Sequence, residues 1–122
     1  MIVLDSSCWI SIFKGESGSE QFVEALEKAD LVLVPSVCIY EVGKLLIREI
    51  GEDLALEAIA AMKQYRIIVI DADISLEAAF LSLKHEIPFA DSIILAVSKK
   101  YRAVLWTNDA HFKGLDGVKY LM

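Results

Sequence analysis

Five short apolar runs are spaced along the chain, and longer segments that mix apolar and polar residues separate them. The runs occupy positions 2–4, 31–34, 67–70, 103–107 and 118–121. They are continuous rather than alternating, which is typical of parallel strands buried on both faces. The pattern predicts an α/β fold: a three-layer α/β/α sandwich with a mainly parallel central sheet.

The intervening segments carry helix signals. Ser17 and Glu20 have the spacing of a capping box, and apolar residues follow at helical spacing as far as Ala29. Asp73 and Asp91 are suitable caps for two later helices. We expect the helices that follow the first one at 36–50, 53–65, 74–85 and 92–101.

Length and hydropathy limit the class of protein. The chain has 122 residues, of which 56% are hydrophobic. This suits one compact domain over residues 1–122 and argues against disorder. No run approaches the roughly 20 apolar residues that a membrane span needs, and the first residues lack a basic segment typical of a signal peptide. We therefore expect a cytoplasmic protein with an apolar core, or with an apolar surface that a partner covers.

Charge and cysteine content add two expectations. The formal net charge is −6, from 12 basic and 18 acidic residues. This argues against broad electrostatic binding of nucleic acid, but not against an acidic metal site. Cys8 and Cys38 show no metal-binding spacing and lie in apolar surroundings, so we expect two buried free thiols.

Several acidic residues stand where a parallel sheet would bind a ligand. Asp5, Asp71 and Asp109 follow predicted strands, and ligands of such sheets bind outside the carboxyl ends of the strands. Glu41 lies inside an apolar helix, and a glutamate is seldom buried in such surroundings without a partner. Each acid alone also has a simpler interpretation. Asp5, Asp91 and Asp109 could cap helices, Glu41 could face water beside its neighbour Lys44, and Asp71 and Asp73 are best explained as turn and cap residues.

The combination of these acids is more specific than any one of them. Asp5 is followed by Ser6-Ser7, Glu41 lies early in its helix, and Asp91 stands in the segment Phe89-Ala90-Asp91-Ser92. The fourth motif is Thr107-Asn108-Asp109-Ala110-His111-Phe112. In order and spacing the chain resembles the PIN-domain nucleases from residue 3 to about residue 121. It is most similar to the toxins of VapBC-type toxin–antitoxin pairs. Ser6-Ser7 departs from the Thr-Asn of many relatives.

The resemblance implies that Asp5, Glu41, Asp91 and Asp109 converge on Mg²⁺, with Mn²⁺ as a substitute. Asp5 and Asp91 would be the main metal ligands, and Glu41 and Asp109 would bind the metal directly or through water. Close carboxylates stay ionised only with cations between them, and hard oxygen ligands favour these ions. Ser7 and Thr107 would hydrogen-bond the ligands or a phosphate. Asn108 is a weaker candidate that could only shape the turn.

The resemblance also implies an activity and partners. The chain would be a metal-dependent endoribonuclease and the toxin of a type II toxin–antitoxin pair, with an RNA substrate, an antitoxin protein partner and a homodimeric state. Two alternatives remain open: a PIN-fold RNA-processing nuclease outside such a pair, and a catalytically silent PIN-fold binding module. A receiver-type signalling domain fits less well, because one acid follows the first strand instead of two. We interpret His111 as a local structural residue.

Overall fold

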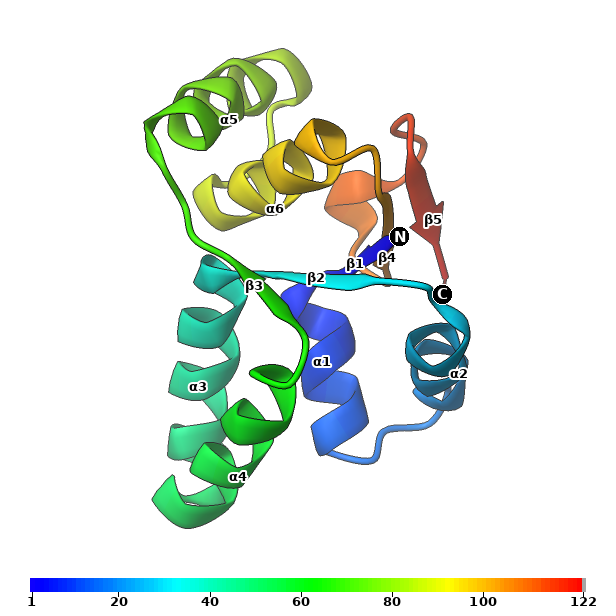
Figure 1. Ribbon diagram of the computed structural model, residues 1–122, viewed down its shortest axis with the longest axis vertical. Helices are drawn as coiled ribbons and strands as arrows, with labels where there is room; N and C mark the ends of the chain where they lie inside the picture. Colours follow the sequence, from blue (N-terminus) through cyan, green and yellow to red (C-terminus); the bar gives the residue numbers. More distant parts are fainter. Residues whose placement is uncertain (122) are drawn as a thin grey trace.

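The computed structural model describes residues 1–121 and has a five-stranded sheet at its centre (Figure 1). The strand order is β3-β2-β1-β4-β5, and every neighbouring pair is parallel. The strands are β1 (Ile2–Leu4), β2 (Val32–Pro35), β3 (Arg66–Ile68), β4 (Val104–Thr107) and β5 (Val118–Tyr120). The predicted parallel sheet is therefore confirmed, and each strand overlaps one of the apolar runs.

Six α-helices cover the two faces of the sheet. In Figure 1, α5 and α6 lie on one side of it and α1 to α4 lie on the other. The bounds are α1 (Ser6–Phe13), α2 (Glu20–Lys28), α3 (Ser36–Ile50), α4 (Glu52–Met62), α5 (Ala72–His85) and α6 (Phe89–Lys100), followed by a 3₁₀ helix, η1 (Ala110–Phe112). This is the α/β/α sandwich that the sequence predicts. None of the helices within residues 1–121 has the length and apolar character needed to cross a bilayer.

The core is built from the central strands and the helices nearest to them. Val3 and Leu4 of β1 are fully buried, as are Leu33 and Val34 of β2. Trp9 of α1 is 2% exposed and packs on aromatic neighbours, with its ring centroid 6.0 Å from that of Phe13 and 5.7 Å from that of Tyr65. The apolar residues that follow Asp5 therefore belong to the core.

Three predicted helix starts are wrong. Ser19, not Ser17, precedes α2, and it makes no side-chain capping bond. The preceding Gly18 has φ +90°, which breaks any helix that starts at Ser17. Asp71, not Asp73, caps α5 by accepting the Ile74 N–H at 2.9 Å. The helix α6 begins at Phe89, directly after Pro88, so Asp91 lies within its first turn instead of before it.

The edge strands depart from burial on both faces. The third run was expected to be a strand over 67–70, but β3 ends at Ile68 and Val69 is 73% exposed. This strand pairs only with β2, so one of its edges has no strand beside it. Within this sheet, only β1 and β2 are buried along their whole length; β4, which also has a strand on each side, leaves Val104 42% exposed.

Candidate active site

The adjacent strands β1 and β4 bring the first and last motifs together. Leu4 pairs with Trp106, and the Asp5 N–H donates to the Trp106 carbonyl at 2.9 Å. Just beyond the strand ends, the Thr107 hydroxyl donates to Asp5 Oδ2 at 3.0 Å. Parallel strands end at the same edge of a sheet, which is why residues about a hundred positions apart meet here.

Asp5 is a buried carboxylate held by hydroxyl groups. It is 2% exposed, and its Oδ2 also accepts from Ser7 Oγ at 2.7 Å. Burial raises the pKa of Asp5 to about 6, although both hydroxyl bonds oppose the rise, and the charges of Asp91 and Asp109 add to it. Asp5 stands at the N-cap position of α1 but makes no capping bond, so the capping interpretation of its side chain is wrong.

Asp91, Asp109 and His111 form a compact cluster beside Asp5. One ligand atom of each lies within 4.8 Å of the others. His111 Nδ1 is 2.9 Å from Asp91 Oδ2 and 3.2 Å from Asp109 Oδ1. Burial, and then the charge of Asp109, raise the pKa of Asp91 above its usual value. The hydrogen bond with Asp91 and the charge of Asp109 raise the pKa of His111.

The imidazole of His111 thus contacts two of the four predicted carboxylates, and its interpretation as a structural residue stays a prediction. Asp109 does cap the short helix η1, since its Oδ1 accepts the His111 N–H at 2.9 Å. The same turn that makes Asp109 a cap brings the His111 ring to Asp91. In the sequence, the only sign of this contact is that a histidine stands two positions after Asp109.

Glu41 faces the carboxylate cluster from α3. It is partly buried, and its Oε1 accepts a hydrogen bond from Ser6 Oγ at 2.7 Å. Its charge contributes to the raised pKa of Asp91, so the two side chains are electrostatically coupled. Ser6 was not singled out from the sequence, and its position next to Asp5 is the one signal that could have identified it.

Hydroxyl and amide groups tie the acidic residues into one network. Thr107 Oγ1 accepts the Asp109 N–H at 2.9 Å while it donates to Asp5, so it links both acids. Ser7 Oγ lies 2.7 Å from both Asp5 Oδ2 and Asn108 Oδ1. Because a hydroxyl has one proton, Ser7 donates to only one of these oxygens at a time. Asn108 is thus in contact with the site through Ser7.

The chemistry of this donor set fits a hard divalent cation. Within residues 1–121, no lysine or arginine forms an ion pair with Asp5, Glu41, Asp91 or Asp109, and the contact with His111 carries charge only when its imidazole is protonated. Burial and the charges of neighbouring acids raise the pKa of Asp5 and of Asp91 in the metal-free protein. Carboxylate oxygens are the ligands that Mg²⁺ and Mn²⁺ prefer.

The remaining acids and thiols lie outside this cluster. Asp71 is exposed, caps α5 and lies 3.6 Å from Lys100 Nζ, so it has a structural role, although the cap was expected at Asp73. Cys8 and Cys38 are buried free thiols, as predicted. Burial raises the pKa of both thiols far above the usual value. They are unreactive neighbours of the site.

A family model described as the PIN domain matches residues 2–118. Solved structures with similar folds come from toxin–antitoxin systems. A toxin–antitoxin complex from Klebsiella pneumoniae superposes with a TM-score of 0.84 at 24% identity, covering 98% of this chain and 96% of that one. No curated protein is significantly similar in sequence.

Two further structures have the same fold. VapC20 of Mycobacterium tuberculosis, a toxin that cleaves the sarcin–ricin loop, has a TM-score of 0.77 at 22% identity, with 97% of this chain and 98% of that one covered. VapBC2 of Rickettsia felis, bound to a DNA fragment from its promoter, has a TM-score of 0.78 at 18% identity, with 98% of both chains covered.

Proposed function

This chain belongs to the PIN domain family, and on that premise we propose that it is a metal-dependent endoribonuclease, the toxin of a type II toxin–antitoxin pair. One observation carries the nuclease proposal: Asp91 and Asp109 share a cluster with His111, and their charges act on Asp5. Such a carboxylate set suits phosphodiester hydrolysis with Mg²⁺, or with Mn²⁺ as a substitute.

The roles of the side chains are proposed from the resemblance to the PIN family, and their contacts support them. Asp5 and Asp91 would be the main metal ligands, and Asp109 and Glu41 would bind the metal directly or through water. A bound ion would lower the pKa of a water molecule and hold a phosphate oxygen of the RNA. Ser7 and Thr107 fix the Asp5 carboxylate by hydrogen bonds. Glu41, held by Ser6, can accept a hydrogen bond from the attacking water and so orient it.

The toxin proposal is supported by the similar structures, which come from toxin–antitoxin complexes and from an RNA-cleaving toxin. The net charge of −6 means that the metal site supplies much of the attraction for RNA. An RNA substrate and an antitoxin protein partner follow from this proposal, as does action in the cytoplasm.

A cleavage assay tests the nuclease proposal. End-labelled, mixed-sequence single-stranded RNA is incubated with the protein in Mg²⁺, in Mn²⁺ and in EDTA. We expect cleavage with either metal, none in EDTA, and loss of cleavage in Asp91→Asn and Asp5→Ala. Asp73→Asn is the matched control, because Asp73 is an exposed acid of α5 that touches none of these groups. A fully active Asp91→Asn protein would overturn the site assignment.

The two alternatives give different outcomes in the same proteins. A silent binding module would bind RNA but leave it intact under every condition. An RNA-processing nuclease would cleave RNA in vitro, yet its induced expression would not arrest growth. For a toxin we expect induction of the wild-type protein to arrest growth, and induction of Asp91→Asn to leave growth unaffected.

A homodimer is also part of the proposal. Large apolar side chains are exposed on α5 and at the start of α6: Phe80 is 63% exposed, Leu83 82% and Phe89 74%. A second copy of the chain would cover them. Sedimentation should give a dimer for the wild type and a monomer for Leu83→Lys. The control Leu54→Lys, at an exposed position of α4, should stay dimeric.

A further inference from the structure

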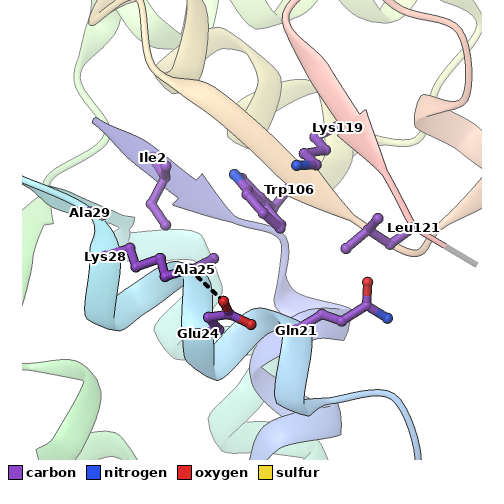
Figure 2. A pocket seen from close by; sticks show the side chains of 9 residues that line it. All are labelled: Ile2, Gln21, Glu24, Ala25, Lys28, Ala29, Trp106, Lys119 and Leu121. Carbon is purple, nitrogen blue, oxygen red and sulfur yellow. Dashed lines mark hydrogen bonds and ion pairs between the residues drawn. The ribbon is translucent and has the colours of Figure 1, made fainter.

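A hollow of about 530 Å³ lies between α2 and the sheet, apart from the carboxylate cluster (Figure 2). Three neighbouring strands line one side of it, with Ile2 from β1, Trp106 from β4 and Lys119 from β5. Leu121 lies at one end, near Gln21 of α2. The small residues Ala25 of α2 and Ala29, just after that helix, line the opposite side, and the indole of Trp106 is partly exposed.

The hollow combines a flat aromatic ring with a positive charge. Lys119 Nζ lies 4.3 Å from the centroid of the Trp106 ring. Lys119 is exposed and forms no ion pair with any residue of the described chain, 1–121. Lys28 of α2 differs, because it is paired with Glu24 at 2.6 Å. The Lys119 ammonium lies over the Trp106 ring, and its side chain is flexible. It can therefore turn toward an anionic ligand that reaches the indole.

Backbone contacts link the strands that line the hollow to the segment that carries the carboxylates. Trp106 directly precedes Thr107, and the Trp106 carbonyl accepts the Asp5 N–H at 2.9 Å. At the end of the hollow, the Leu121 N–H donates to the Thr107 carbonyl at 2.8 Å. The hollow and the Asp5 carboxylate are thus separate sites on adjoining parts of the same two strands, β1 and β4.

We propose that this hollow is a nucleotide subsite for single-stranded RNA, in which a base stacks on the Trp106 indole and Lys119 pairs with a neighbouring phosphate. The inference rests on the proposed function, because it assumes an RNA substrate at the carboxylates. Indole–base stacking tolerates any sequence, since every base has a π-face. The side-chain amide of Gln21, on the rim, has the donors and acceptor needed to bond a base edge.

A nucleotide fits this combination better than a protein segment does. An apolar side chain would fill the floor of the hollow but leave the Lys119 ammonium without an anionic partner. A nucleotide supplies a flat ring and a negative charge at adjacent positions. The local positive charge is also notable in a chain with a net charge of −6, which otherwise repels RNA.

Direct binding of RNA without turnover tests the proposal. The probe is a short, mixed-sequence, single-stranded RNA with a fluorophore at one end, and its anisotropy is measured at a fixed Mg²⁺ concentration and several concentrations of monovalent salt. All proteins carry Asp91→Asn, which removes one repelling charge and prevents cleavage. To this background we add Trp106→Leu, Trp106→Phe or Lys119→Gln. Thermal melting establishes that each protein is folded, and Trp106→Phe retains an aromatic ring if the leucine variant is unstable.

We expect Trp106→Leu to weaken RNA binding about tenfold, because one stacked base is lost, and Trp106→Phe to weaken it less. The logarithm of the affinity falls as the logarithm of the salt concentration rises. Lys119→Gln should make this fall less steep by about 0.7, the value for one phosphate contact on a single strand. The control is Lys100→Gln, at the far end of α6. It removes the same charge from a lysine 5.9 Å from the Tyr101 ring, although this lysine, unlike Lys119, also pairs with Asp71, and it should leave the slope unchanged.

The outcomes separate this subsite from the proposed function. If RNA is cleaved with Mg²⁺ but the Trp106 and Lys119 variants bind it like the Lys100 control, the subsite is overturned and the nuclease stands. A protein partner would then be the remaining candidate to bind in the hollow. If the wild-type protein neither binds nor cleaves RNA, the proposed function fails and the subsite fails with it.

Discussion

Asp5 is 2% exposed and still lies next to two other acids, so its carboxylate is costly to ionise in the metal-free protein. The hydroxyl groups of Ser7 and Thr107 offset part of this cost, but the pKa of Asp5 remains at about 6. A buried carboxylate at this position does not favour the stability of the metal-free protein. Such an unfavourable ionisation is expected of a residue that binds a cation.

The first prediction concerns Asp5→Asn in EDTA. A carboxylate whose pKa is raised by folding binds more protons in the folded state, so metal-free wild-type stability should fall as pH rises from about 4 to about 6. Asn removes this loss. Urea unfolding should show the variant more stable at pH 7, by up to about 3 kcal/mol, and no more stable than wild type near pH 4.

The matched control for this prediction is Asp73→Asn, an exposed acid on α5. It should not reproduce the gain in unfolding free energy at pH 7 that is expected for Asp5→Asn. If Asp5→Asn showed the same difference from wild type at both pH values, its carboxylate would not be the group that titrates.

Thr107 gives the second prediction, because its buried hydroxyl serves two acids at once. Thr107→Val keeps the shape but removes the donor to Asp5 and leaves the Asp109 N–H without its acceptor. We expect a loss of about 1–3 kcal/mol in unfolding free energy, together with slower cleavage. Thr107→Ser keeps the hydroxyl and should restore both. A valine variant as stable and active as the serine variant would contradict this linking role.

Among the elements, α6 does most to position the site. It starts directly after Pro88, and its first turn carries Asp91, which is 9% exposed. A carboxylate near a helix N-terminus is favoured by the free N–H groups and by the helix dipole. The helix α3, which follows the neighbouring strand β2, carries Glu41 in its second turn. The positions of these acids therefore depend on where the helices begin.

The third prediction concerns the end of α5. Glu86 stands at its C-cap with φ +54°, a left-handed conformation that glycine adopts at lower cost. Glu86→Gly should stabilise the protein by about 0.5–1 kcal/mol. Lys84→Gly, two residues earlier in the same helix, should destabilise it by about 1 kcal/mol. Urea unfolding of both variants checks the opposite signs, and a destabilised Glu86→Gly protein would contradict the prediction.

For the whole molecule, metal binding at the proposed site would be coupled to stability. Asp91 and Asp109 share a cluster with His111, and neither they nor Asp5 and Glu41 form an ion pair with a lysine or arginine in the described chain. A cation that binds there binds only the folded protein, because the unfolded chain does not bring these acids together. The metal would therefore act on the stability of the entire fold.

The fourth prediction follows from this coupling. Mg²⁺ or Mn²⁺ at millimolar concentration should raise the melting temperature of the wild-type protein by stabilising the native state alone. Asp91→Asn should melt higher than wild type in EDTA and lose most of the shift with metal. Asp73→Asn should keep the full shift. Differential scanning fluorimetry measures all three proteins, and an equal shift in Asp91→Asn would exclude Asp91 as a principal ligand.

Local patterns in the sequence were enough to predict the α/β/α sandwich and the positions of its strands. Apolar runs and turn residues act over a few positions, so they survive in a single sequence. The helix starts were less predictable, because Ser17, Asp73 and Asp91 were plausible caps and only the backbone at Gly18, Asp71 and Pro88 decided among the choices.

Tertiary structure alone decided which side chains meet. The strand order β3-β2-β1-β4-β5 puts β1 beside β4, so Ser7 contacts Asn108, 101 positions away. It also brings His111 to Asp91, pairs Ser6 with Glu41, and leaves the hollow beside Trp106 and Lys119. Contacts over such separations depend on the packing of whole elements, and no local pattern of residue types encodes that packing.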